Sequence, residues 1–323
     1  MKNIVALYLF FSLIPLLTAQ AEPRPLKTCQ ISKSPRQQHA PETAFCNDCI
    51  YWQNGIVPYE FDPNVQAWQQ TAMLDAMAVW ESVANVDFVP RNGQSDYLKI
   101  RDANENSSQV GKQGGGQTVN IYNWNYPMVM CHELAHALGF YHEQSRPDRD
   151  NYVRINQGNI CPGQEHNFDI DDTGVTPNIP YDFNSIMHYG KFGFARCQNP
   201  NENCNDGCSS GYVGPTIEIL PAFDNGQNNI GQRIQLSRSD SLMMSFVYPY
   251  AHYRFVNGSY LGTFPYGQYL YAPLLHFTVS WMDSSYVPEM ATVWIMPGEY
   301  TIAEGTYTKP MTVRAPFGGV VLK

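Results

Sequence analysis

Apolar and polar residues are arranged differently in successive parts of this 323-residue chain. Residues 4–17 form a mostly apolar run, whereas residues 22–42 are polar, contain proline and show no apolar periodicity. Residues 43–250 mix helical and strand periods, and residues 251–323 hold short apolar runs separated by Gly and Pro. We therefore expect a short N-terminal segment, a polar leader, one large domain and a small β-rich domain.

The large domain is expected to open with a strand followed by a helix. Residues 56–61 alternate as a strand, and the pair Asp62-Pro63 is typical of a helix start. The next apolar positions keep helical spacing and predict one buried stripe that includes both tryptophans: Val65, Trp68, Ala72, Ala76, Trp80 and Val83.

The rest of the large domain alternates short strands with two further helices, and residues 147–182 are rich in loops. The expected elements are strands at 88–89, 97–100 and 118–122, a helix from about Pro127 to Leu138 and a last helix from Ser239 to Tyr248. Beyond residue 250, four runs suggest a small all-β domain without an internal repeat: LHFTVSW, ATVWIM, EYTIAEG and MTVRAPF. The predicted fold class is therefore α+β.

The N-terminal apolar run is typical of a signal peptide. Lys2 precedes it, and Ala19-Gln20-Ala21 provides a small-residue cleavage site. A membrane anchor is the alternative, but the run is short and ends in small residues, which favours removal of residues 1–21. No other segment is apolar for long enough to span a bilayer. We expect a secreted, extracellular protein.

Composition narrows the possible partners and the redox compartment. The net charge of −9 and the absence of a basic stretch argue against nucleic-acid binding. The eight cysteines suit an oxidising compartment, although their connectivity cannot be deduced from the sequence. Three of them lie within residues 195–214, which predicts a disulfide-stapled insert. Asn106-Ser-Ser and Asn257-Gly-Ser are candidate glycosylation sites.

The sequence HELAHALGFYHE, residues 132–143, is the strongest chemical signal. His132 and His136 lie one helical turn apart and can share one metal ion, with Glu133 placed to take a proton from a metal-bound water. Gly139 can turn the chain sharply past the helix end and bring His142 back as a third ligand. Three imidazoles predict one zinc ion per chain with an open position. The alternative, a solvated polar helix face, explains a bare H-E-x-x-H better than it explains the extended motif.

A second motif downstream supports the metal site. Ser185-Ile-Met-His-Tyr189 supplies the methionine turn that extended zinc motifs of this kind require. Met187 is expected to form a hydrophobic floor beneath the zinc. Alone the pentapeptide would carry no weight, but after the zinc motif it is strong support.

These segments resemble the astacin family of zinc endopeptidases. The resemblance is carried by HELAHALGFYHEQSRPDRDNY (132–152) and SIMHYGKF (185–192), and extends from WQNGIVPYEF (52–61) through NFDID (167–171) to about Tyr248. It implies a metzincin, astacin-like protease domain of two lobes over residues 43–250.

The resemblance also implies roles for matching residues. His132, His136 and His142 would bind zinc, and Glu133 would be the general base. Tyr189 would be a switchable ligand that leaves the metal to hydrogen-bond the developing oxyanion. Glu143 would hold the new N-terminus after activation, and residues 118–122 would be the edge strand that aligns substrate.

The sequence also departs from the family pattern. The usual cysteine pairs of the catalytic domain have no counterparts, and Cys131 is either a buried free thiol or a disulfide partner. The leader, residues 22–42, lacks the motif that places an aspartate on the zinc in family pro-segments. Cys29 lies about where that aspartate would be, so it could ligate zinc in a latent form. A disulfide at Cys29 is the alternative.

The leading interpretation is a secreted zinc-dependent endopeptidase, made as a zymogen, that hydrolyses protein or peptide substrates after cleavage by an activating protease. A catalytically inactive binding or adhesion protein on the same scaffold is the alternative, although every expected active-site residue is present. A third possibility is that the aromatic region after residue 250 binds carbohydrate or a surface. Aromatic residues of that kind more often fill the core of a β domain.

Overall fold

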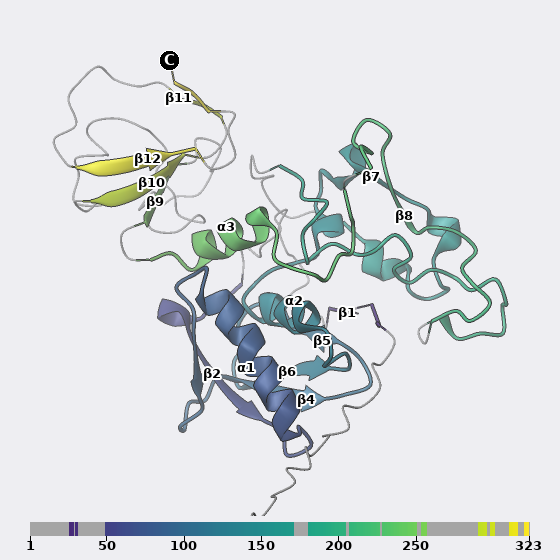
Figure 1. Ribbon diagram of the computed structural model, residues 1–323, viewed down its shortest axis with the longest axis horizontal. Helices are drawn as coiled ribbons and strands as arrows, with labels where there is room; N and C mark the ends of the chain where they lie inside the picture. Colours follow the sequence, from purple (N-terminus) through teal and green to yellow (C-terminus); the bar gives the residue numbers. More distant parts are fainter. Residues whose placement is uncertain are drawn as a thin grey trace, which may run out of the picture.

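The computed structural model of the chain describes residues 26–28, 30–31, 49–170, 180–204, 207–226, 228–250, 253–256, 290–295, 298–300, 310–315 and 320–322. The expected signal peptide, Cys29, most of the leader, Asn257 and the run LHFTVSW lie outside these residues. Figure 1 shows a lower lobe built on a sheet and two helices, an irregular lobe beside it, and a group of strands near the C-terminus.

The lower lobe contains a six-stranded sheet with the strand order β1-β5-β6-β4-β2-β3. All neighbouring pairs are parallel except β5 and β6, which are antiparallel. The strands are β1 (Gln30–Ile31), β2 (Ile56–Phe61), β3 (Asp87–Pro90), β4 (Tyr97–Asp102), β5 (Ser107–Ser108) and β6 (Gly116–Ile121).

The expectation that residues 118–122 would form the edge strand is wrong. They belong to β6, which is paired on one side with β4 and on the other with β5. The position beyond β6 is taken by the two-residue strand β5, and β1 from the leader lies outside β5. A strand of two serines is too short and too polar to show alternation, so periodicity could not reveal it.

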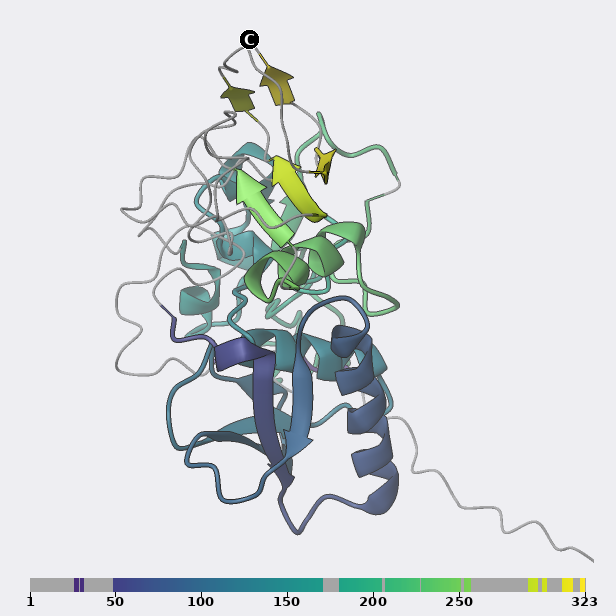
Figure 2. The same ribbon diagram turned by 90° about the vertical axis from the view of Figure 1, so that its left-hand side faces the viewer.

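Two helices pack against each other beside this sheet: α1 (Ala67–Glu81) and α2 (Pro127–Ala137), as Figure 2 shows. Pro127 at the first position of α2 fits the predicted start. Helix α1 begins later than predicted. Asp62 still continues the sheet, because its N–H donates to Ile100 O (2.8 Å). The cap of the helix is Gln66, which forms reciprocal hydrogen bonds with Gln69.

The buried face of α1 differs in part from the predicted stripe. Trp80 is buried and its Nε1 donates to Cys131 O at 2.9 Å, which ties α1 to α2. Trp68 is 42% exposed, so its predicted place in the core is wrong. The buried stripe of the helix begins one residue after Trp68, at Gln69, and contains Gln69, Met73, Ala76, Met77 and Trp80.

The second lobe is mostly irregular and is held by two disulfides and an aromatic cluster. Cys161 pairs with Cys204 and Cys197 with Cys208, which confirms the stapled insert. Phe168 belongs to this cluster, is 1% exposed and packs edge-on against Tyr189 and Phe194. The regular elements are 3₁₀ turns at Glu143–Ser145, Arg149–Asn151, Gln157–Asn159 and Glu165–Phe168, and the antiparallel pair β7 (Val153–Ile155) and β8 (Ile217–Ile219).

Helix α3 (Arg238–Val247) follows this lobe, close to the predicted position, and connects it to the C-terminal strands. Among the described residues after 250, neighbouring strands are parallel: β9, β10 and β12 form one sheet, and β11 and β13 form another. Trp294 of β10 packs edge-on against Phe246 of α3 (5.6 Å between ring centroids). The strands are β9 (Tyr253–Val256), β10 (Ala291–Ile295), β11 (Gly298–Tyr300), β12 (Met311–Arg314) and β13 (Val320–Leu322).

One of the two candidate glycosylation sites, Asn106, is not accessible in the folded protein. Asn106 is fully buried, and its Nδ2 donates to Lys27 O (3.2 Å) and Asn123 Oδ1 (2.8 Å). A glycan would have to be joined to that same nitrogen, so the sequon at Asn106 cannot be used in the folded protein.

In the described residues, no helix combines the length and apolar character that crossing a membrane would need.

Candidate metal centre

Helix α2 places His132 and His136 on one buried face, and the chain beyond it returns His142 to the same point. The three Nε2 atoms lie 3.1 Å apart (His132 and His136), 3.2 Å apart (His136 and His142) and 3.2 Å apart (His132 and His142). Each imidazole is at most 2% exposed. The sequence prediction that these three side chains converge is therefore confirmed.

Gly139 makes this return possible. Its φ of +108° lies in a region that L-residues with a side chain rarely adopt, and its N–H donates to His136 O (2.8 Å) to close the helix. A Cβ at this position would lie 2.6 Å from Cε1 of Tyr51. Both the backbone conformation and the close packing therefore require glycine here.

The outer nitrogens of two imidazoles are tied to backbone carbonyls. His132 Nδ1 lies 2.6 Å from Ile186 O, and His136 Nδ1 lies 2.6 Å from Phe140 O. A carbonyl only accepts, so each Nδ1 carries the proton and each Nε2 presents a lone pair to the centre. Convergent lone pairs at this spacing repel one another unless a cation lies between them.

The centre fits zinc. Bonds of about 2.0–2.1 Å in a tetrahedral site separate two ligand nitrogens by roughly 3.3 Å, close to the spacing seen here. Burial lowers the pKa of His136 to about 4 and that of His132 and His142 well below the ordinary value, so all three are neutral, as metal binding requires. The Nδ1 carbonyl bonds are the outer contacts that usually orient such ligands.

The predicted methionine turn lies directly against the centre. Ile186 O is the acceptor for His132, and Met187 O accepts the N–H of Glu143 (3.1 Å). Met187 is 2% exposed and belongs to the main core. The turn thus contacts the chain on both sides of the histidine cluster, in agreement with a supporting role.

Tyr189 and Glu133, the two predicted catalytic residues, are both buried. The Tyr189 ring lies against His142, with 4.3 Å between centroids, and its N–H donates to Gln144 Oε1 (2.9 Å). Glu133, on α2 directly after the first histidine, has no exposed surface. The structure thus places Tyr189 against one of the metal-binding histidines and buries Glu133 on the helix that carries the other two.

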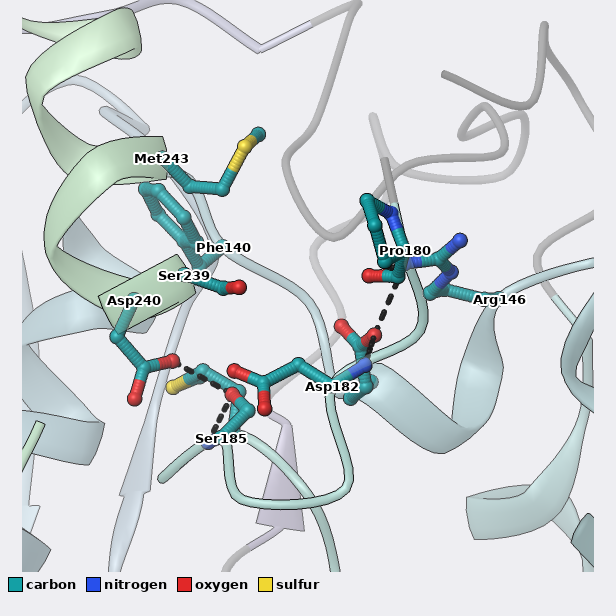
Figure 3. Close-up of a pocket in the computed structure, with 10 residues that line it drawn as sticks. Phe140, Arg146, Pro180, Asp182, Ser185, Ser239, Asp240 and Met243 are labelled. Carbon is teal, nitrogen blue, oxygen red and sulfur yellow. Dashed lines mark hydrogen bonds and ion pairs between the residues drawn. The ribbon is translucent and has the colours of Figure 1, made fainter. Parts of the chain in front are cut away.

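Glu143, directly after the third histidine, lines a separate cavity shown in Figure 3. Its Oε1 accepts from Arg146 Nη1 and from Asp182 N, each at 2.9 Å. Burial outweighs the arginine and raises the pKa of Glu143 to about 7. Asp182 and Asp240 also line the cavity, which has about 20 Å³ of space, enough for one water-sized group.

Comparison with known proteins identifies the fold. Residues 46–249 match the model of the Astacin peptidase family. The chain belongs to the astacin family of zinc metalloendopeptidases. The solved structure of high choriolytic enzyme 1 from Oryzias latipes, a hatching enzyme zinc-protease, is similar, with a TM-score of 0.52 and 33% identity. That match covers 62% of this chain and 93% of the other.

Two curated astacins are also similar to part of this chain. The Astacin-like metalloendopeptidase of Gallus gallus is 36% identical over 210 residues, which are 63% of this chain and 47% of that protein. Meprin A subunit alpha of Rattus norvegicus is 37% identical over 196 residues, which are 59% of this chain and 24% of that protein. The chain therefore spans about half the length of the first and about a quarter of the second.

The sequence analysis did not identify Asp240, which supports this astacin site. Asp240 on α3 accepts hydrogen bonds from Ser185 Oγ (2.6 Å) and Ile186 N (3.0 Å), and so fixes the methionine turn. Its only local signal is the capping box formed with Ser237 at the start of α3. Of the two alternatives for Cys131, the buried free thiol is the one that the structure shows.

Proposed function

We propose that this chain is a zinc-dependent endopeptidase that hydrolyses peptide bonds in protein or peptide substrates. The observation that carries the proposal is the convergence of three neutral imidazole nitrogens, 3.1–3.2 Å apart, two of them from the helix that also carries the buried Glu133. Bound zinc would supply Lewis-acid chemistry toward water and the scissile carbonyl.

The protein's own groups carry the proton transfers. Glu133 would accept a proton from the attacking water and then deliver it to the departing amine, as one general base and acid. Tyr189, which lies against His142, would donate its hydroxyl to the oxygen that becomes negative during attack. Its release from the metal to make that bond is part of the same proposal.

We propose the same division of the chain that its composition suggests. Residues 1–21 would be removed as a signal peptide, residues 22–42 would be a pro-segment, residues 43–250 the protease domain, and residues 251–323 a small β-rich domain. Secretion follows from the signal peptide and is supported by the two disulfides of the second lobe.

The cavity at Glu143 suits the ammonium group of a newly cut N-terminus. Three carboxylates line it, those of Glu143, Asp182 and Asp240, and one guanidinium, that of Arg146. Arg146 is already paired with Asp148 through two hydrogen bonds of 2.8 and 2.9 Å. The cavity therefore has excess negative character, and one more cation would balance it.

Latency through Cys29 remains part of the proposal. A thiolate from the leader would complete the zinc ligand set until the pro-segment is removed. The alternative is a disulfide, and Cys49 is disulfide-bonded, with Cys29 and Cys46 as the candidates for its partner. In the full chain, Cys29→Ser should raise activity before processing while Cys46→Ser should not. Unchanged latency in Cys29→Ser rejects the switch.

The main experiment separates the protease from an inactive binding protein on the same scaffold. The processed chain is assayed for casein hydrolysis, with and without a zinc chelator, and zinc content is measured alongside. We expect hydrolysis that the chelator stops and added zinc restores, and a Glu133→Gln variant that keeps zinc but loses at least roughly a thousandfold in kcat. A zinc-loaded wild-type chain that cleaves neither casein nor a peptide library would support the binding protein instead.

A further inference from the structure

Lys27, in the leader, contacts residues in the segments that follow strands β4 and β6. Its backbone N–H donates to Asn123 Oδ1 at 2.9 Å, and its carbonyl accepts from Asn106 Nδ2 at 3.2 Å. Its ammonium donates to Asn104 O at 3.1 Å and lies 4.5 Å from the centroid of the Tyr122 ring. Both the backbone and the side chain of one residue are therefore recognised.

The two amides that bind the backbone are buried and held in place by the protein itself. Asn106 and Asn123 are at most 1% exposed. Asn106 Oδ1 accepts from Tyr122 N (2.9 Å) and Asn123 N (3.0 Å), which fixes the amide so that Nδ2 faces Lys27. The same Nδ2 also bonds Asn123 Oδ1, which orients the second amide. One donor and one acceptor are thus prearranged for the carbonyl and N–H of one residue.

The rest of the segment lies along the sheet as an extended strand. Three and four residues after Lys27, Gln30 and Ile31 pair with Ser107 and Ser108 of β5 in parallel register. Chain addition at a sheet edge gives affinity through the backbone, and pockets for individual side chains give specificity. The contacts of Lys27 supply such a side-chain pocket at the start of this strand.

The pocket suits a basic side chain. The carbonyl of Asn104 and the face of the Tyr122 ring both carry negative partial charge toward the ammonium group. An acidic side chain would meet two repulsive partners, and an apolar one would leave the carbonyl to water.

We propose that Asn104, Asn106, Tyr122 and Asn123 form a subsite for a lysine residue of an extended peptide. Lys27 fills it in the unprocessed chain, and a lysine of a protein substrate would enter it once the leader is removed. The substrate half of the proposal rests on the proposed endopeptidase function, whereas the leader half does not. The two halves are tested separately.

The first experiment uses the full chain and measures amide hydrogen exchange in β1. Lys27→Met removes the charge and should speed exchange by roughly threefold to tenfold, as expected for loss of a cation–π contact and one ammonium hydrogen bond. Lys27→Arg keeps the charge and should restore protection. Tyr122→Leu should act like Lys27→Met, while Tyr126→Leu, which replaces a half-buried tyrosine outside the subsite, should not. Equal exchange in wild type and Lys27→Met overturns the subsite.

The second experiment uses the chain after limited proteolysis has removed the leader. Quenched fluorescent peptides carry one lysine, or norleucine in its place, at each position in turn. We expect one position at which lysine lowers KM about threefold or more, and that preference should disappear in Tyr122→Leu and persist in Tyr126→Leu. No such position, with peptides still cleaved, restricts the subsite to the leader and overturns its substrate half. No cleavage of any peptide refutes the endopeptidase proposal and leaves the exchange result standing.

Discussion

Asp240 on α3 and Ile186 in the methionine turn are joined by a hydrogen bond of 3.0 Å from the Ile186 N–H to the carboxylate. The carbonyl of the same Ile186 accepts from His132 Nδ1 at 2.6 Å. A residue about one hundred positions after the first histidine therefore sets the backbone that orients it. Asp240 positions the metal ligand through another residue and does not itself touch the metal.

Replacing Asp240 should weaken zinc binding as well as stability. Asp240→Ala leaves the buried Ile186 N–H and Ser185 hydroxyl without their acceptor, which should cost about 2–4 kcal/mol of unfolding free energy. Because His132 loses its fixed partner, the zinc dissociation constant should rise roughly tenfold. Chelator competition and urea unfolding measure the two effects.

Two control variants make the Asp240 test specific. Asp240→Asn keeps one acceptor and should give an intermediate loss of zinc affinity. Asp75→Ala removes an exposed carboxyl on α1 and should change neither quantity. Zinc affinity equal to wild type in a destabilised Asp240→Ala would show that Asp240 supports the fold without orienting His132.

Gly139 should tolerate no side chain. Gly139→Ala forces a residue with a Cβ to adopt φ of +108° and places that Cβ 2.6 Å from Tyr51. We expect a loss of about 2–4 kcal/mol in stability and weaker zinc binding, because the turn that returns His142 must open. Thermal unfolding and zinc titration measure both.

Gly158→Ala is the matched control for this substitution. Gly158 has no atom within 4 Å of an added Cβ and no positive φ. The double variant Gly139→Ala/Tyr51→Leu relieves the contact but not the backbone conformation, so it should recover only part of the loss. Full recovery would show that crowding alone, and not the backbone, requires glycine.

The sequence predicted those parts of the site that depend on local spacing. His132 and His136 are one helical turn apart on any helix, and Gly139 marks the end of that helix, so convergence with His142 could be foreseen. Helix α3, expected from Ser239 to Tyr248, is found close by at Arg238–Val247 and opens with a capping box formed by Ser237 and Asp240. Each of these signals lies within a few residues.

Features that depend on distant pairing could not be predicted. Ser107 and Ser108 form a strand only because β6 and the leader lie on either side of them. Asp62 does not start a helix because its N–H is bonded to Ile100 of a neighbouring strand, and Trp68 is exposed because the buried stripe of α1 begins at Gln69. The parallel pairing of β10 with β12 is invisible in either strand alone.

His188 should make the stability of the protein depend on pH. Its imidazole is buried and neutral, since Nδ1 donates to Tyr189 O and Nε2 accepts from Tyr181 Oη. Burial lowers its pKa from 6.5 to about 4, so between these values the unfolded chain binds more protons. The contribution of His188 is therefore complete above pH 6.5 and is lost as pH falls through about 4, a change of roughly 3 kcal/mol.

Urea unfolding of wild type and His188→Gln isolates this contribution. Both proteins share the three metal histidines, so the difference between their pH profiles belongs to His188. We expect the variant to be less stable than wild type at about pH 7.5, and the gap to shrink toward about pH 4.5. A constant gap across that range would contradict a neutral, buried imidazole.

Trp294 should anchor the C-terminal strands to the protease domain. Its ring lies 5.6 Å from that of Phe246, which is fully buried on α3, the helix that also carries Asp240. Trp294→Ala removes a half-buried indole and should cost roughly 2 kcal/mol, less than the roughly 3–5 kcal/mol for a fully buried tryptophan. We expect faster limited proteolysis between residues 251 and 290, with zinc content unchanged.

Val313→Ala, on the exposed face of β12, is the control and should leave the cleavage rate as in wild type. Equal cleavage of all three proteins would show that the Trp294 contact does not hold these strands in place.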